Sequence, residues 1–157
     1  MRAATRVAWL VGMVGLIGGT TWPDLAAQRL ELGGAVVGTS RPVAGGVVGP
    51  SLGLRVSRRD RVVVNLGLGT RDAGLMGRSE IGWQVLLDPT RREGVSPFAG
   101  AGMALERDTT WRELVMVEVG VAVRPGAGPG WTLSLGLGGG FRLMASHRWR
   151  IGPPPEP

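Results

Sequence analysis

Few side chains in this 157-residue chain could carry catalytic or metal chemistry. His147 is the only histidine and cysteine is absent, so neither a histidine cluster nor a thiolate metal site can form. Ser146 adjoins His147, but neighbouring residues of a strand point to opposite faces, which prevents a nucleophile and base pair. Gly138, Gly139 and Gly140 resemble a phosphate loop only in composition, because no lysine follows them. We therefore expect no enzyme, no metal and no cofactor.

The formal net charge is +6, and all 18 basic residues are arginine. These arginines fall in turn-like segments or singly along alternating segments, often with an acidic residue nearby. A nucleic-acid interface would instead require a basic face interleaved with aromatic residues. We therefore expect no nucleic-acid partner.

The arginines and glutamates belong to segments in which apolar residues alternate with small or polar ones, most regularly over residues 131–138 and also over 61–70 and 115–124. This two-residue period predicts β-strands with one aliphatic face. The other face carries glycine, asparagine, serine and single charges. Many glycines fall on this polar face, where they would relieve crowding inside a narrow barrel.

Turn residues divide the chain into segments of about 9 to 11 residues or slightly more, the length of a tilted transmembrane strand. Residues 131–145 form either one long strand or two strands joined by a turn at Gly138–Gly140, and closure of an antiparallel barrel favours an even count. The predicted fold is all-β, an antiparallel up-and-down transmembrane β-barrel of eight strands. Its strands are expected at 29–37, 47–57, 61–70, 75–87, 97–107, 111–124, 131–137 and 141–149.

Alternation places eleven residues on the polar face, and the charged ones among them are of mixed sign. Buried charges persist only in pairs, and the arginine fork suits carboxylates. We expect a plug of salt bridges inside the barrel, with a gated ion path as the alternative. Polar residues at 71–72 and 106–108 are interpreted as solvated loop ends. The predicted lumen charge network is Glu31, Arg55, Arg78, Glu80, Arg112, Glu118 and Arg142, accompanied on the polar face by Asn65, Gln84, Thr132 and Ser134.

The aromatic residues fall near strand ends. In a membrane barrel, two girdles of aromatic residues flank the aliphatic band, one at each bilayer interface. The alternative is a soluble barrel with its apolar face inward, in which these residues cap the core. The predicted interface aromatics are Trp83, Trp111, Trp131 and Trp149, together with Phe98 and Phe141.

The beginning of the chain predicts export. Arg2 and Arg6 precede an apolar run of about 13 residues at 7–19, shorter than the roughly 20 needed to span a membrane. This order is typical of a secretory signal peptide over residues 1–27, with cleavage after Ala27 or Gln28. Residues 28–151 would then form the barrel, and 152–157 a disordered proline-rich tail.

Over residues 29–149 this Gly-rich, cysteine-free pattern with short turns resembles the small outer-membrane β-barrel proteins of the OmpA/OmpX type. The resemblance implies an eight-stranded barrel filled by side chains, located in the cell outer membrane. It also implies two partners, the lipid bilayer and the outer-membrane assembly machinery, and leaves any ligand unknown. We expect a non-enzymatic role, structural or in surface interaction; the alternatives are an exported soluble barrel that binds an apolar ligand and a small-conductance pore.

Overall fold

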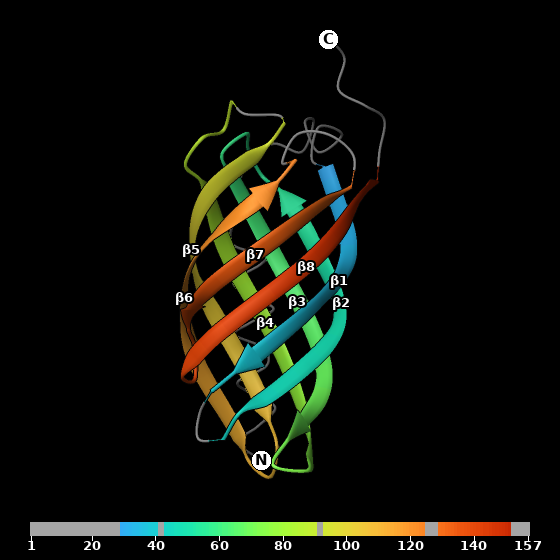
Figure 1. Cartoon of the computed structure of the whole chain (residues 1–157), viewed down its shortest axis with the longest axis vertical. Coiled ribbons are helices and arrows are strands. Elements are labelled where there is room, and N and C mark those ends of the chain that lie inside the picture. The colour runs from blue at the N-terminus through green and yellow to red at the C-terminus, as the bar shows by residue number, and fades with distance from the viewer. Residues whose placement is uncertain (1–28, 41–42, 91–92, 125–128, 152–157) are drawn as a thin grey trace, which may run out of the picture.

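The computed structural model of the chain describes residues 29–40, 43–90, 93–124 and 129–151 (Figure 1). The predicted signal peptide at 1–27 and the predicted tail at 152–157 lie outside the described residues. Among the described residues, no helix is long and apolar enough to cross a membrane.

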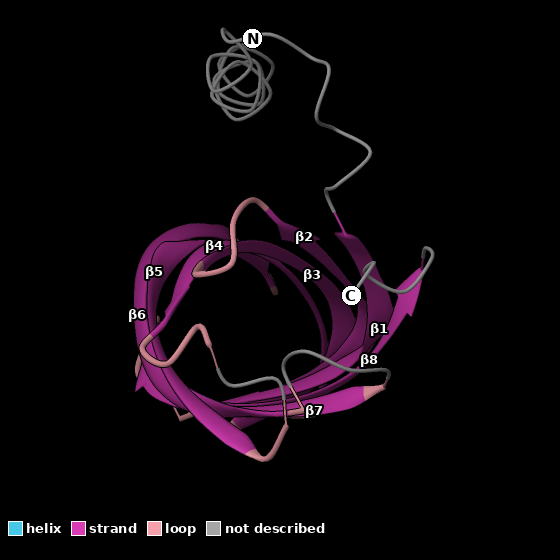
Figure 2. Cartoon of the chain, turned by 90° about the horizontal axis from the view of Figure 1, so that it is seen from above, coloured by secondary structure: helices cyan, strands magenta, loops and turns pink. Residues whose placement is uncertain are grey.

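Eight antiparallel strands follow one another around a closed barrel, each paired with its neighbour in sequence (Figure 2). Pairing of the first strand with the last closes the ring, with Leu30 opposite Ile151 and Thr39 opposite Arg142. The predicted all-β, eight-stranded, up-and-down architecture is therefore confirmed. The strands are β1 (Arg29–Thr39), β2 (Gly45–Arg55), β3 (Asp60–Arg71), β4 (Gly74–Leu86), β5 (Val95–Arg107), β6 (Trp111–Val123), β7 (Gly130–Leu137) and β8 (Phe141–Ile151).

The two ends of the barrel differ in their connections. We call the end where β1 begins and β8 ends the terminal end (top of Figure 1), and the opposite end the turn end. The terminal end carries the connections 56–59, 87–94 and 124–129, whereas the turn end carries 40–44, 72–73, 108–110 and 138–140. Three of the four connections at the turn end have only two or three residues, whereas those at the terminal end have four to eight.

Two tight turns at the turn end show how the chain reverses. Gly139 and Gly140 have φ values of 82° and 118°, which a residue with a Cβ rarely adopts, and they let β7 turn directly into β8. Asp72 and Ala73 join β3 to β4 with φ values of 48° and 59°. Positive φ at both central residues defines a type I′ hairpin turn. Ala73 adopts this conformation without the glycine that usually relieves it.

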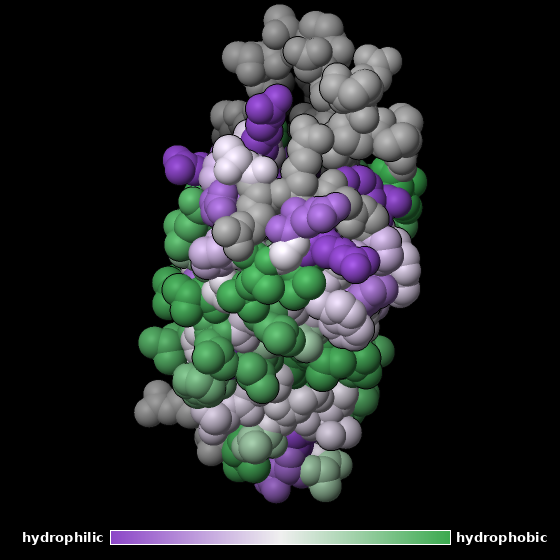
Figure 3. Space-filling view, turned by 45° about the horizontal axis from the view of Figure 1, so that its top comes forward, coloured by the Kyte–Doolittle hydropathy of each residue, from purple (hydrophilic) through white to green (hydrophobic). Residues whose placement is uncertain are grey.

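Apolar side chains face outward along the strands. On β7 the outward residues Leu133, Leu135 and Leu137 are 48%, 47% and 59% exposed. Hydrophobic side chains form a broad band across the middle of the visible face, and hydrophilic ones gather towards the terminal end (Figure 3). A protein in water would not expose so many contiguous large aliphatic side chains.

The interior holds two small apolar clusters among many polar groups. Val37, Val47, Met76 and Met144 pack together inside the barrel, and Leu86, Phe98 and Ala122 form a second cluster. Phe98 is only 1% exposed, so its assignment to an interface girdle is wrong. A Cβ on the facing Gly120 would lie 2.7 Å from the Phe98 ring, so this glycine makes room for the ring.

Candidate functional site: the charged barrel interior

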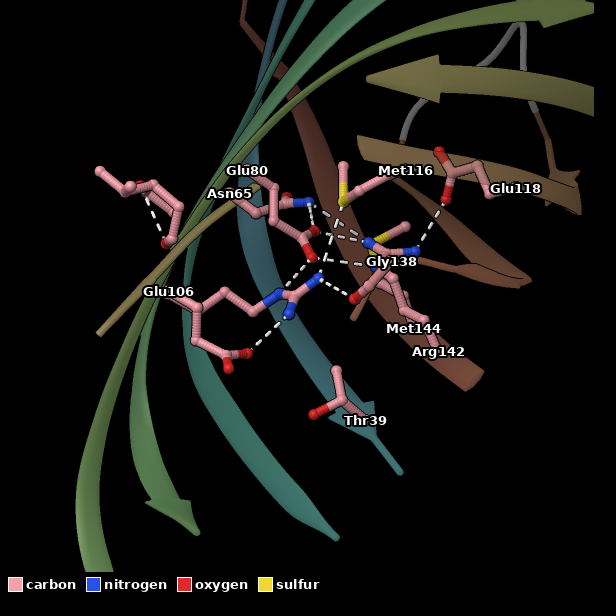
Figure 4. Close-up of polar contacts among 12 residues, drawn as sticks. Thr39, Asn65, Glu80, Glu106, Met116, Glu118, Gly138, Arg142 and Met144 are labelled. Atoms are coloured by element: carbon pink, nitrogen blue, oxygen red, sulfur yellow. Dashed lines mark hydrogen bonds and ion pairs between the residues drawn. The ribbon is translucent and has the colours of Figure 1, made fainter. Parts of the chain in front are cut away.

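The middle of the barrel contains an arginine held between two glutamates from other strands. Arg142 on β8 places Nη2 2.5 Å from Glu80 Oε2 and Nη1 2.9 Å from Glu118 Oε2. Figure 4 shows Arg142 between these two carboxylates. Both glutamates and Arg142 are nearly inaccessible to solvent. Such charges remain ionised inside a protein only when paired and hydrogen-bonded.

The same arrangement continues towards the turn end. Arg78 places Nε 2.7 Å from Glu80 Oε1 and Nη1 2.8 Å from Glu106 Oε2. Arg71 forms an ion pair with the other oxygen of Glu106 and donates to Thr39 Oγ1 over 2.7 Å. Arg71 and Glu106 are 7% and 2% exposed. Their interpretation as solvated loop ends is therefore wrong, because the last residue of β3 and the next-to-last residue of β5 still point into the barrel.

Towards the terminal end, a glutamine extends the polar contacts. Gln84 Nε2 donates to Glu118 Oε1 over 2.5 Å, while Gln84 Oε1 accepts from Arg61 Nε over 3.0 Å. Ser134 Oγ donates to Glu118 Oε2 over 2.7 Å. Arg61 also lies against Phe98, with its guanidinium carbon 5.8 Å from the ring centroid.

At the terminal end one carboxylate faces several guanidinium groups. Glu31 Oε2 lies 2.5 Å from Arg148 Nη1 and 3.5 Å from Arg61 Nη1. Glu31 Oε1 lies 3.5 Å from Arg55 Nε and 4.0 Å from Arg150 Nη2. We call these four arginines with Glu31 the terminal arginine cluster.

The buried charges form two groups along the barrel. In the middle and towards the turn end, Arg71, Arg78 and Arg142 face Glu80, Glu106 and Glu118; we call these six residues the central charge network. Its formal charges balance. In the terminal arginine cluster, Glu31 lies within 4.0 Å of four arginines, and two of these, Arg55 and Arg150, have further interactions.

Arg112, one of the expected network members, lies elsewhere. Its side chain is 38% exposed and its Nη2 lies 3.3 Å from Asp108 Oδ2 at the rim of the turn end. The backbone N–H of Thr110 and the Arg112 guanidinium hold the pKa of Asp108 below its usual value. Arg112 thus belongs to the rim, because it is the second residue of β6 and its side chain reaches water.

The four predicted interface tryptophans point outward. Trp83, Trp131 and Trp149 lie near the terminal end, and Trp111 begins β6 at the turn end. Trp131 and Trp149 flank the outward-facing His147, with ring centroids 4.6 Å and 4.5 Å from the imidazole. Trp83 Nε1 donates to Asp60 Oδ1 over 3.1 Å, which gives its polar edge a partner beside water.

The cleft beside Glu80, among the described residues, is small. The cleft lined by Asn65, Arg78, Glu80 and nearby apolar residues has room for a group of about the size of one water molecule. The described residues contain no grouping of three His, Asp or Glu side chains that could hold a metal. The interior side chains around this cleft can thus balance charge, and they leave no space there for a bulky apolar ligand.

Several interior residues were not predicted from the sequence, although the alternating pattern indicates them. Arg61 lies on the same strand face as Asn65, and Arg148 on the same face as Arg142. Both arginines are buried. Counting alternate residues to the ends of the strands would have found them. Glu106 and Arg71 were missed for the same reason, since turn-like neighbours obscured their place on the strand.

Comparison with known proteins defines the class of fold. No family model matches the chain, and no curated protein matches it. Among solved structures, the N-terminal β-barrel domain of Pseudomonas aeruginosa OprF superposes with a TM-score of 0.58 at 13% identity, over 79% of this chain and 99% of that chain. This is the fold of the small eight-stranded transmembrane β-barrels.

Two further structures share this fold. Neisserial surface protein A superposes with a TM-score of 0.58 at 14% identity, over 79% of this chain and 97% of that chain. A de novo designed transmembrane β-barrel gives 0.57 at 16% identity, over 78% and 95%. The architecture implied by the resemblance to the OmpA/OmpX type is confirmed; at these identities the likeness concerns the fold alone.

Proposed function

We propose that the protein is a non-enzymatic outer-membrane β-barrel whose interior is closed by ion pairs. The observation that carries this proposal is the direction of the side chains. Large aliphatic residues such as Leu68 and Val115 face outward and are 66% and 75% exposed, while Arg142 and Glu80 face inward and are 1% and 3% exposed. This distribution suits lipid outside and a side-chain-filled lumen inside.

The rival function, a soluble barrel that binds an apolar ligand, requires the reverse distribution. Its interior would be aliphatic and hollow, whereas here Glu118, Arg142 and Ser134 occupy the middle of the lumen. A small-conductance pore is the second candidate, favoured only by the polar character of the interior. Contacts within the central charge network leave little room for a continuous water path, which supports the plug.

The short connections at the turn end favour a structural role over surface interaction. Export would deliver the chain to the inner side of the outer membrane. The start of β1 and the end of β8 would then remain on the inner side, and the turn end would face outward. Bacterial barrels commonly carry their longer loops on the outer side. Here that side would carry the connections 40–44, 72–73, 108–110 and 138–140, which offer little surface to a macromolecular partner.

Two measurements test the proposal. In the first, membranes from cells expressing the full chain are extracted with salt and alkaline carbonate. The gel mobility of the protein is then compared before and after boiling. The second is conductance in planar bilayers. We expect the protein to remain in the outer-membrane pellet and to migrate differently before and after boiling. Release by carbonate would contradict membrane insertion. In planar bilayers we expect no large, stable conductance, and such conductance would contradict the plug.

A further inference from the structure

His147 is an ionisable residue on the outer face of the barrel. Its neighbours on β8, Ser146 and Arg148, are buried in the lumen, whereas the His147 side chain is half-buried on the outside. Ionisable residues of membrane-spanning segments almost always face the protein interior or a water-filled cavity. A histidine that faces outward among aliphatic residues therefore requires a polar partner on that face.

Two tryptophans flank the imidazole. Trp131 lies opposite His147 on β7, and Trp149 follows two positions later on β8; their ring centroids lie 4.6 Å and 4.5 Å from that of the imidazole. We call these three residues the aromatic triad. Among the described residues, the ring nitrogens of the triad have no hydrogen-bond partner. The outward-facing Trp83, by contrast, donates its ring N–H to Asp60.

The side of His147 that faces β1 is open, because a glycine lies there. β8 lies between β7 and β1 on the face shown in Figure 1. Gly34 on β1 is the residue opposite His147. It is exposed, and a Cβ at this position would lie 3.8 Å from the nearest atom, the backbone oxygen of Gly49. The imidazole is thus covered by an indole ring on the β7 side and accessible to a ligand on the β1 side.

The aromatic triad lies near the terminal end, and aliphatic side chains continue from it towards the turn end. Trp131 is the second residue of β7, and Trp149 lies two residues before the end of β8. The outward-facing Leu133 and Leu143 are 48% and 54% exposed. Tryptophan is enriched where hydrocarbon meets the lipid headgroups. A ligand that fits this surface therefore has oxygen atoms beside the triad and an apolar tail over the leucines.

We propose that the aromatic triad binds one glycerophospholipid, with its phosphate beside the ring nitrogens and an acyl chain along β8 and β1 past Gly34. The indole N–H can only donate, and the imidazole donates through at least one nitrogen, so the phosphate oxygens are suitable acceptors. The acyl chain matches the aliphatic surface. A free phosphate would match only the triad, and a hydrocarbon only the leucines. This inference rests on the proposed membrane location.

His147 is the only histidine of the chain, so its imidazole gives a specific spectroscopic signal. The folded protein is prepared without a histidine tag, with ¹⁵N-labelled histidine, in maltoside micelles that contain no phosphate. Phosphatidylglycerol is added stepwise, and the imidazole nitrogen signals are followed by NMR. We expect shifts that saturate with one lipid bound per barrel. Absence of a saturable shift in the folded barrel would overturn the proposal.

Two related compounds separate the parts of the ligand. Diacylglycerol with the same acyl chains lacks the phosphate, and glycerophosphate lacks the chains. We expect neither to produce a saturable shift at the concentrations at which phosphatidylglycerol does. An equal response to diacylglycerol would show that the triad does not recognise phosphate. An equal response to glycerophosphate would assign the site to a free phosphate, and either result would overturn the proposal.

Two glycine variants locate the site. Gly34→Ile should weaken phospholipid binding by about tenfold or more, because the new side chain would occupy the space of the ligand. The matched control is Gly38→Ile, four residues further along the outer face of β1, where a Cβ would meet no atom within 4 Å. It should leave binding unchanged. Equal effects of the two variants would refute the location, and heat-dependent gel mobility confirms the folding of each.

Trp131→Phe keeps an aromatic ring but removes its N–H. It should weaken binding by about fivefold, the effect of one lost hydrogen bond, whereas Trp83→Phe should leave binding unchanged. Full binding by Trp131→Phe would contradict the assigned role of this N–H. A protein that resists carbonate extraction but shows no saturable shift overturns this inference alone. Release by carbonate would contradict the membrane location itself, and this inference with it.

Discussion

Gln84 donates its side-chain amide to Glu118 Oε1 over 2.5 Å and thereby joins the terminal arginine cluster to the central charge network. Its carbonyl oxygen accepts from Arg61 on the other side. Because of this one neutral residue, polar contacts continue from Glu31 at the terminal end to Arg71 at the turn end.

Replacing Gln84 with leucine should lower the free energy of unfolding by about 1 to 3 kcal/mol, because buried groups of Arg61 and Glu118 lose a partner. Unfolding in urea, followed by tryptophan fluorescence, measures the change. Ser79→Ala on the same strand is the control, since its hydroxyl makes only a contact of 3.5 Å with a backbone oxygen. Equal stability of the two variants would show that Gln84 does not link the two groups.

Glu118→Ala should cost about 3 kcal/mol or more, because it leaves Arg142 with an uncompensated buried charge. Glu113→Ala on the same strand removes an exposed carboxylate, and a surface change of this kind alters stability by about 0.5 kcal/mol or less. Urea unfolding of both variants in the same lipid provides the comparison. A Glu118→Ala barrel as stable as Glu113→Ala would mean that water fills the lumen.

Leu135→Arg should impair assembly and cost about 2 to 4 kcal/mol if the residue meets the hydrocarbon core. Its neighbour Ser134 is 2% exposed, whereas Leu135 is 47% exposed. Ser134→Ala should cost only about 1 kcal/mol, for the loss of its hydrogen bond to Glu118 and of a longer one from Arg142. The fraction of protein that acquires heat-dependent gel mobility reports assembly. Similar assembly of both variants would argue for water outside the barrel.

Ala73→Gly should stabilise the barrel by about 1 kcal/mol, because a left-handed conformation is unfavourable for a residue with a Cβ. Ala73 has a φ of 59° in the turn between β3 and β4. The control is Ala101→Gly on β5, where added backbone freedom should instead destabilise. Thermal or urea unfolding distinguishes the two, and destabilisation by Ala73→Gly would contradict the assigned turn.

Replacing Leu10 and Val14 with arginine should block export, because the apolar run that a secretory signal requires is interrupted. We expect an unprocessed precursor in the cytoplasm, detected by fractionation and by mass spectrometry of the N-terminus. Arg2→Lys retains the charge and should be exported normally. Envelope location of the doubly substituted chain would show that residues 1–27 do not act as the signal.

Alternation of residue types predicted strands with one aliphatic face, and the even strand number that closure of an antiparallel barrel favours was also needed to predict eight strands with a turn at 138–140. The period of two is a local property of extended chain, so each strand can be recognised without its neighbours. The same pattern also placed Glu80, Glu118 and Arg142 on one face of their strands. Its weakest point was the strand ends, where Glu106 and Arg71 were mistaken for solvated residues.

Only the tertiary structure decided which arginine pairs with which glutamate. Arg142 on β8 pairs with Glu80 on β4, 62 positions away in sequence. No local sequence pattern predicts this pairing. Closure of the ring and the stagger of its strands determine the height at which each side chain enters the lumen. For this reason the sequence by itself determined that each strand has one aliphatic face and one polar, partly charged face, whereas the balanced central charge network and the gathering of arginines around Glu31 follow from the three-dimensional arrangement of the strands.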